Sequence, residues 1–312
     1  MNSSHLTQRV LTPVVTPFDA NGAPSASRLA RHCRSMIDHD VGLALFGTNS
    51  EANSLSVAEK RHLLDTLIAD GLPPARMMPG TGACALPDAI ELTRHAVEAG
   101  CAGVLMLPPF YYKNVCDEGL FRSFATVIDA VADARLRVFL YHIPAVAQVG
   151  ISLGLIERLL NAYPSVIAGI KDSSGDWANT SAIIDAFGKS GFDVMAGSET
   201  FLLQTLRAGG AGCITATANV NARNIAQLAR TWQTPEADDQ QQRLNALRGI
   251  FTRFPVIPAM KAAIAWQSGD ENWSRVRPPL VELTRQQRNA LEADLTAIDF
   301  RIENAGSFAE PA

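Results

Sequence analysis

The stretch at positions 166–173 reads VIAGIKDS, in which five uncharged residues are followed by Lys171, Asp172 and a serine. A continuous run of this kind is typical of a parallel strand that is buried on both faces. Seven other runs have the same character, and each ends in a polar or Gly/Pro-rich turn: 10–16, 41–46, 77–80, 103–107, 137–141, 193–196 and 212–216. The sequence therefore predicts eight short buried strands.

The segments between these runs carry apolar residues three and four positions apart, which is the spacing of one helix face. Two serines mark the expected starts of helices. Ser25 precedes the first such segment, and Ser56 precedes the second with Glu59 three positions later. Serine is a favoured N-cap, and glutamate at the third helical position completes a capping box.

Eight strands that alternate with helices, about 29 residues apart, predict a (β/α)8 TIM barrel at residues 1–222. A doubly wound open sheet is the competing fold. Its Gly-x-Gly-x-x-Gly turn does not occur, and residues 80–82 match it only in part. Residues 223–312 carry helical patterns throughout and predict a C-terminal helical extension packed on the barrel. We expect its tail, 304–312, to be frayed.

Composition excludes several classes of protein. The 312 residues include 27 basic and 31 acidic side chains, and 47% are hydrophobic, so disorder is not expected. A net charge of −4 without a Lys/Arg run does not favour nucleic-acid binding. No apolar stretch is long enough for a membrane span, and residues 1–9 do not resemble a secretory signal. Five widely spaced cysteines without a Cys-x-x-Cys pair indicate a reduced, cytoplasmic protein.

In a TIM barrel the chemistry lies at the carboxyl ends of the strands. Lys171 directly follows an apolar run, and burial favours the neutral amine that attacks a carbonyl carbon. From its position alone, Lys171 could instead reach the rim or pair with Asp172. Tyr141 also ends a strand and could relay a proton, or it could be a core tyrosine. Thr48 could join that relay or serve as a turn residue.

Other polar residues at the predicted strand ends support fewer kinds of chemistry. Residues 47–50 offer backbone N–H groups that suit a carboxylate. His142 stands alone beside Ile143 and Pro144, which favours a structural role. No cluster of His, Asp or Glu has metal-ligand spacing. The residue types of a hydrolase triad are present in Ser50, His142 and Asp172. The Gly-x-Ser-x-Gly elbow that would support such a triad does not occur.

Seven motifs, in order and along nearly the whole chain, resemble those of one family. They are Thr12-Pro13-Val14-Val15-Thr16-Pro17-Phe18, Gly47-Thr48-Asn49-Ser50-Glu51, Gly80-Thr81-Gly82-Ala83, Pro108-Pro109-Phe110-Tyr111-Tyr112, Tyr141-His142-Ile143-Pro144, Gly169-Ile170-Lys171-Asp172-Ser173 and Thr217-Ala218-Asn219-Val220. The family is the dihydrodipicolinate synthase / N-acetylneuraminate lyase superfamily of pyruvate-dependent class I aldolases.

This resemblance implies a role for each matching residue. Lys171 would form a Schiff base with a 2-oxo acid, and Tyr141 would be the acid/base beside it. Thr48 and Tyr112, the latter often supplied by a neighbouring subunit, would complete a proton relay. Gly47 and Asn49 would hold the carboxylate. In addition, Ile214 would pack against the bound pyruvate. The resemblance implies no metal and no organic cofactor, and it implies a homotetramer.

Departures from the family pattern bear on the substrate. Synthases usually have a second threonine and then a glycine in the first loop, where this chain has Asn49 and Ser50. Synthases also have an arginine five residues after the strand tyrosine, which binds the carboxylate of aspartate semialdehyde. That position is Val146 here, and valine cannot bind an anion. Glu199 matches an acidic position that binds substrate hydroxyls in sugar-acid enzymes, although it could also be an exposed loop carboxylate.

We therefore expect a cytoplasmic lyase that cleaves a 2-keto-3-deoxy sugar acid, or a related 4-hydroxy-2-oxo acid, to pyruvate and an aldehyde. Dihydrodipicolinate synthase is the nearest alternative, and Val146 disfavours it. A dehydratase of 2-keto-3-deoxy acids would use the same imine. A catalytically silent protein that binds 2-oxo acids is the alternative outside the enzymes.

Overall fold

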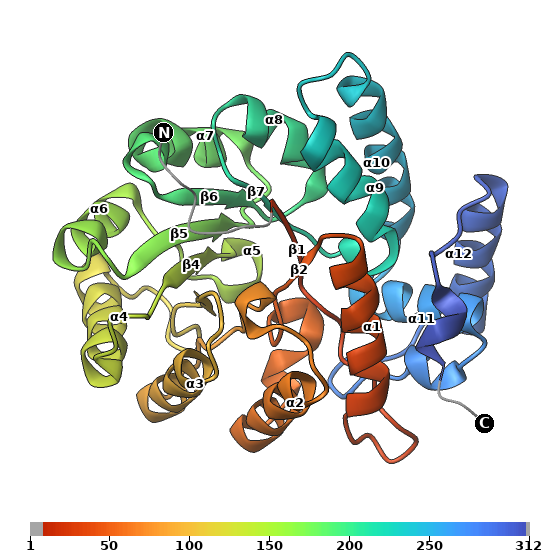
Figure 1. Ribbon diagram of the computed structural model, residues 1–312, viewed down its shortest axis with the longest axis horizontal. Helices are drawn as coiled ribbons and strands as arrows, with labels where there is room; N and C mark the ends of the chain where they lie inside the picture. Colours follow the sequence, from red (N-terminus) through yellow and green to blue (C-terminus); the bar gives the residue numbers. More distant parts are fainter. Residues whose placement is uncertain (1–8, 310–312) are drawn as a thin grey trace. The chain divides into compact units, whose positions relative to one another are not determined.

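The computed structural model describes residues 9–309 and divides them into two compact units. The first unit comprises Arg9 and residues 74–214, and the second comprises residues 10–73 and 215–309. Each unit has its own strands, helices and hydrophobic core. The strands and helices alternate along the chain, as the sequence predicts (Figure 1).

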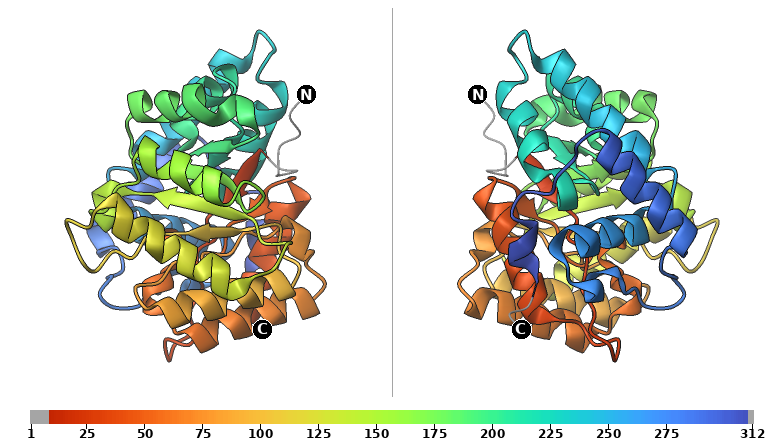
Figure 2. Two further views of the ribbon diagram at one scale, coloured as in Figure 1. Left: turned by 90° about the vertical axis from the view of Figure 1, so that its left-hand side faces the viewer. Right: turned by 90° about the vertical axis from the view of Figure 1, so that its right-hand side faces the viewer.

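The first unit contains a parallel sheet in the order β7-β6-β5-β4-β3. Its strands are β3 (Val104–Met106), β4 (Val138–His142), β5 (Ile167–Asp172), β6 (Asp193–Ala196) and β7 (Gly212–Ile214). The helices are α3 (Leu86–Glu98), α4 (Asp117–Val131), α5 (Pro144–Ala147), α6 (Leu153–Ala162), α7 (Trp177–Phe187) and α8 (Leu202–Arg207). Helices α3, α4 and α6 follow one another along the outside of the strands (Figure 2, left).

One predicted strand of the first unit is not a strand. Residues 77–80 form only an isolated parallel bridge, between Gly80 and Leu105. The two hydrogen bonds of this bridge run from the Leu105 N–H to the Pro79 carbonyl and from the Thr81 N–H to the Leu105 carbonyl. Pro79 has no N–H to donate, so the ladder cannot extend through it. The described residues therefore contain seven strands where the apolar runs predict eight.

The second unit contains two short parallel strands, β1 (Val10–Thr12) and β2 (Gly42–Leu43). Its long helices are α1 (Ala26–Asp38), α2 (Val57–Ala69), α9 (Ala218–Thr231), α10 (Ala237–Phe251), α11 (Val256–Ser268) and α12 (Arg285–Ala297). The blue helices α11 and α12 lie side by side in the right-hand view of Figure 2.

The predicted helix starts are confirmed. The Ser25 side chain accepts a hydrogen bond from the Arg28 N–H at the start of α1. At the start of α2, the Ser56 hydroxyl accepts from the Glu59 N–H at 3.2 Å. The Glu59 carboxylate in turn accepts from the Ser56 N–H at 2.8 Å, which completes the capping box.

The prediction of a frayed tail is wrong for residues 304–309. Residues Ala305–Phe308 form a short 3₁₀ helix, and the Phe308 side chain is fully buried. Its ring packs against His32 and Trp273, with ring centroids 5.1 and 6.3 Å away. Burial of this aromatic ring outweighs the entropy that a free terminus would gain. Residues 310–312, and the N-terminal residues 1–8, lie outside the described part of the chain.

The strands of the first unit are parallel and follow one another in chain order, without the reversal of a doubly wound sheet, which is typical of a TIM-barrel-like α/β fold. Across residues 9–309, none of the helices combines the length and apolar character that crossing a membrane requires.

Candidate active site

Lys171 lies next to the last residue of β5, and only 3% of its surface is exposed. Successive side chains of a strand point to opposite faces of the sheet. Lys171 therefore shares one face of β5 with Gly169, whereas Ile170 and Asp172 point to the other. The strand holds an amine in a buried position at the carboxyl end of the sheet, as the sequence predicts.

Asp172 is occupied by groups on the opposite face. Its carboxylate accepts hydrogen bonds from the Thr180 hydroxyl at 2.6 Å, the Asn179 amide at 3.1 Å and the Ser174 N–H at 2.9 Å. Thr180 and Asn179 belong to α7, so Asp172 fastens the strand end to that helix. The structure thus gives the Asp172 carboxylate partners other than Lys171, which the sequence alone left undecided.

Tyr141 is the lateral neighbour of Lys171, in register with it on β4. The Lys171 Nζ atom lies 4.3 Å from the centroid of the Tyr141 ring. Both residues are buried, and neighbours in register point to the same face of a sheet. The amine and the phenol predicted to work together are therefore adjacent.

Phe139 and Gly169 form the layer beneath this pair, two residues earlier on the same two strands. A Cβ atom on Gly169 would lie 2.7 Å from the Phe139 ring and 2.3 Å from the Asp193 carbonyl oxygen. Only glycine fits at this position without displacing a neighbour. This packing cannot be recognised from the local sequence, because the ring and the glycine are thirty residues apart.

The end of β7 contributes Ile214, which alternation places on the same face as Lys171. Its neighbour Cys213 is fully buried, and burial raises the pKa of this thiol well above its ordinary value. The nearby charge of Glu199 raises the pKa further, while Lys171 lowers it. Cys213 is therefore held as an uncharged thiol. Glu199 itself is buried, with 1% of its surface exposed, which corrects the reading of an exposed loop carboxylate.

His142 has a structural role, as its position indicates. Its Nδ1 atom accepts a hydrogen bond from the Ile151 N–H at 2.9 Å and so ties the strand end to the segment before α6. Burial lowers the pKa of His142, and Asp172 opposes that effect. The imidazole is thereby favoured in its neutral form.

Tyr112 and Val146 lie on exposed segments of the first unit. The exposed fraction is 73% for Tyr112 and 62% for Val146. The Tyr112 ring packs edge-on against Tyr111, with centroids 5.3 Å apart. Lys113 donates to the Ala147 carbonyl at 2.8 Å and to the Phe110 carbonyl, so it connects the loop at residues 110–113 to α5. Lys113 is a residue whose role the sequence did not indicate.

The Gly47 to Ser50 loop lies in the second unit, after β2. Residues Thr48–Ser50 form a 3₁₀ turn, and the Gly47 N–H donates to the Ser50 hydroxyl at 3.3 Å. Gly47, Thr48 and Asn49 are partly exposed, whereas Ser50 is buried. Ser50, which replaces the family glycine, thus closes the turn through its side chain.

Two buried charges stand directly behind this loop. Glu51 follows it, and Lys261 of α11 donates to the Glu51 carboxylate at 2.7 Å. Both side chains are fully buried. The sequence offered one signal for Lys261: a single charge among the apolar residues of its helix.

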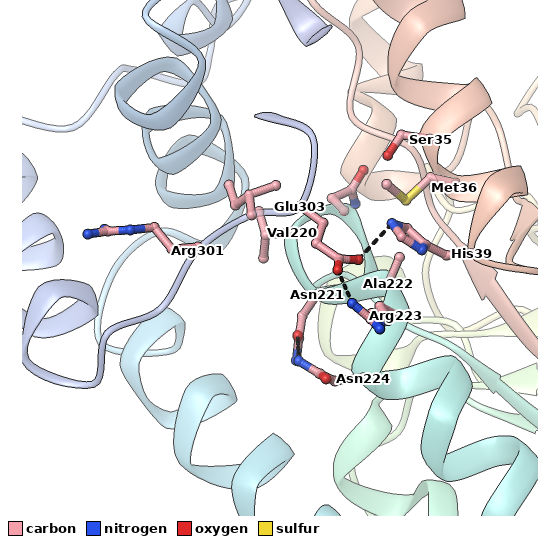
Figure 3. A pocket seen from close by; sticks show the side chains of 12 residues that line it. Ser35, Met36, His39, Val220, Asn221, Ala222, Arg223, Asn224, Arg301 and Glu303 are labelled. Carbon is pink, nitrogen blue, oxygen red and sulfur yellow. Dashed lines mark hydrogen bonds and ion pairs between the residues drawn. The ribbon is translucent and has the colours of Figure 1, made fainter. Parts of the chain in front are cut away.

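A cavity of about 210 Å³ lies elsewhere in the second unit, between α1, α9 and the C-terminal segment (Figure 3). Glu303 points into it and bonds to Arg223, and its other oxygen lies 3.2 Å from His39 Nε2. These contacts fasten the C-terminal segment to the two helices. No group of three or more His, Cys, Asp or Glu side chains in residues 9–309 is arranged to hold a metal ion.

Tyr141 and Lys171 lie at the carboxyl ends of neighbouring strands, which is where α/β enzymes with a TIM-barrel-like fold carry their active sites. The model of the dihydrodipicolinate synthetase family matches residues 6–298. The chain belongs to this family, as the motifs predict, and it is a carbon–carbon lyase.

Individual relatives agree with this assignment. The chain is 34% identical over 292 residues to a DapA-like lyase of Chloroflexus aurantiacus, a match that covers 91% of this chain and 94% of the relative. It is similar to the crystal structure of dihydrodipicolinate synthase from Agrobacterium tumefaciens, with a TM-score of 0.86 and 31% identity. This match covers 92% of the present chain and 98% of the synthase chain. Escherichia coli YagE, a prophage protein of the dihydrodipicolinic acid synthase family crystallised with pyruvate, gives a TM-score of 0.86 at 26% identity. This match covers 95% of the present chain and 99% of YagE.

Proposed function

We propose that the chain is a Schiff-base-forming aldolase that cleaves a 2-keto-3-deoxy sugar acid, or a related 4-hydroxy-2-oxo acid, to pyruvate and an aldehyde. The observation that carries this proposal is the buried Lys171 amine beside the Tyr141 ring, with Asp172 bonded elsewhere. An amine held at the carboxyl end of a barrel strand lies where this fold binds its substrates, so it is placed to attack a carbonyl carbon.

In the proposed reaction, the Lys171 amine adds to the C2 ketone and water leaves, which forms the imine. The imine accepts the electron pair of the C3–C4 bond as that bond breaks. The Tyr141 phenol gives its proton to the departing hydroxyl of the carbinolamine, so the imine forms in its protonated state, and the resulting phenolate then removes the proton from the C4 hydroxyl as the aldehyde departs. Protonation of the resulting enamine and hydrolysis release pyruvate and restore the amine. The sequence of steps requires no metal and no organic cofactor.

Other residues take roles that the family resemblance assigns. Gly47 and Asn49 hold the substrate carboxylate, and Ile214 packs against the pyruvyl group. Thr48 and Tyr112 complete the proton relay. Tyr112 is supplied by a neighbouring subunit of a homotetramer, and its high exposure supports a contact with another copy of the chain.

Val146 favours a sugar-acid substrate over aspartate semialdehyde, because it offers no cation to a second carboxylate. Buried Glu199 supports the same preference, since a buried carboxylate can accept hydrogen bonds from substrate hydroxyls. Dihydrodipicolinate synthase and a 2-keto-3-deoxy acid dehydratase are the alternative activities. A silent 2-oxo acid binding protein is disfavoured by the adjacent Lys171 and Tyr141.

The proposal includes the closed (β/α)8 barrel at residues 1–222, the helical extension at 223–312 and a cytoplasmic location.

The proposal is tested by reduction with borohydride in the presence of pyruvate. We expect a pyruvyl mass on the peptide that holds Lys171, and no such mass in a Lys171→Ala variant. A panel of 2-keto-3-deoxy acids then separates the activities, because an aldolase releases pyruvate whereas a dehydratase retains every carbon. An unmodified Lys171 peptide would refute Schiff-base chemistry. Efficient condensation of pyruvate with aspartate semialdehyde would refute the argument from Val146.

A further inference from the structure

We infer that Glu51 and Lys261 are positioning residues, which hold the Gly47 to Ser50 loop in the shape that receives the substrate carboxylate. This inference rests on the proposed function for the role of the loop. Its physical basis lies wholly within the second unit, in contacts that neither the reaction nor the family motifs explain.

Lys261 joins the segments that follow two neighbouring strands. Its Nζ atom donates to the Thr16 carbonyl at 2.8 Å, beyond β1, and to the Glu51 carboxylate at 2.7 Å, beyond β2. The Thr16 hydroxyl donates to the Ser50 carbonyl at 2.7 Å. The loop is therefore fastened at its last residue and at the residue that follows it, and both connections lead to Lys261.

The second oxygen of Glu51 is also occupied, since it accepts the Arg277 N–H at 2.8 Å. The Arg277 guanidinium donates to the Ser54 carbonyl at 2.7 Å and to Glu59 at 2.6 Å. The segment after the loop is thus held by a network in which each Glu51 oxygen has its own donor. Such a network fixes one conformation, because any shift of the loop would leave a buried charge without its partner.

The backbone of Glu51 indicates why this fastening is needed. Its φ is +57° and its ψ is 36°, a left-handed backbone conformation that residues other than glycine rarely adopt. A residue persists in this region only when its surroundings hold it there. The turn at Thr48–Ser50 ends at this residue, so the conformation of Glu51 sets the direction in which the chain leaves the loop.

A purely stabilising role explains the pair less well. Removing two charges from water costs about as much as their attraction returns, and well-packed apolar residues often stabilise a core equally. A fully buried lysine and glutamate are therefore weak contributors to stability. Their hydrogen bonds, by contrast, fix the segment that follows β1 and the segment that follows β2 in defined positions.

The test compares Lys261→Met, the double variant Glu51→Gln/Lys261→Met, and Leu291→Ala. Leu291 is a fully buried residue of α12 in the same core, so its truncation controls for lost stability. The measurement is the pyruvate concentration that half-saturates borohydride trapping at Lys171, together with the trapping rate at saturation. The double variant leaves no unpaired buried charge, so it reports on the loop if the single variant does not fold.

We expect the half-saturating pyruvate concentration to rise about tenfold or more in both Lys261 variants, as the loss of a charged hydrogen-bond network predicts. The saturated trapping rate should change much less, and Leu291→Ala should keep the wild-type half-saturation. Wild-type half-saturation in the double variant, an equal rise in Leu291→Ala, or a double variant that does not fold would each overturn the inference. Absence of trapping in the wild-type protein would instead refute the proposed function, and the inference would fall with it.

Discussion

Gly169→Ala adds one methyl group directly beneath the Lys171 and Tyr141 pair. The new Cβ would lie 2.3 Å from the Asp193 carbonyl oxygen and 2.7 Å from the Phe139 ring. Ordinary carbon–oxygen contacts are about 3.3–3.6 Å, so β5 and β6 must separate by roughly 1 Å. The Phe139 ring must also move to relieve its own contact with the new Cβ atom. Overpacking of this kind costs about 1–3 kcal/mol of stability. We expect a loss at the upper end of this range, because backbone opposes the methyl on one side.

Displacement of Phe139 should also disturb Tyr141, which lies two residues further along the same face of β4. The control is Gly154→Ala in α6, where the nearest atom to the new Cβ is 3.8 Å away. Alanine in a helix is more favourable than glycine by about 0.5–1 kcal/mol, so this control should gain stability. Urea unfolding measures the change in stability. The rate of borohydride trapping with pyruvate measures the disturbance of the Lys171 and Tyr141 pair.

The expected outcome is opposite changes in unfolding free energy for the two glycine variants, with slower trapping only in Gly169→Ala. If Gly169→Ala unfolds at the wild-type urea concentration and traps at the wild-type rate, then the layer beneath the site has free space. Gly169 would then not be required for close packing at this position.

Three further predictions address the relay, the buried pair and the C-terminus. Tyr141→Phe should lower turnover by about 10²–10⁴, as expected for loss of a general acid/base, while pyruvate trapping at Lys171 still saturates near the wild-type concentration; equal losses would contradict the relay. Burial, opposed by Glu51, lowers the pKa of Lys261 from 10.5 to about 8, so the unfolded chain binds the extra proton between these values. The unfolding free energy of the wild-type protein should therefore rise relative to that of Lys261→Met as pH increases from 8 towards 10.5, by up to about 3 kcal/mol. Urea titrations measure both free energies, and a difference between them that falls over this pH range would contradict the lowered pKa. Phe308→Ala should cost about 3–5 kcal/mol in urea unfolding because the ring is fully buried, and a loss below 1 kcal/mol would indicate a frayed end.

The strand-end residues were predictable because their positions follow from local pattern. An uncharged run followed by Lys171 indicates a buried strand and its end, and the same rule found Tyr141. Whether Lys171 pairs with Asp172 was left open by the sequence, and in the structure the Asp172 carboxylate is bonded to Thr180 and Asn179 of α7. The strand at 77–80 was predicted wrongly because apolar character alone does not register that Pro79 lacks a donor.

The residues that escaped prediction depend on contacts between distant parts of the sequence. Glu51 and Lys261 are 210 positions apart, and Phe139 and Asp193 confine Gly169 from two other strands. A lysine in an apolar helix still carries information, because a buried ammonium requires a partner of opposite charge. The sequence therefore indicates that Lys261 must have such a partner, while only the folded chain identifies it as Glu51. The two buried lysines differ in their surroundings: Lys261 is bonded to a carboxylate, which fits the positioning role we infer for it, whereas Lys171 faces an aromatic ring, which fits the reactive amine we propose.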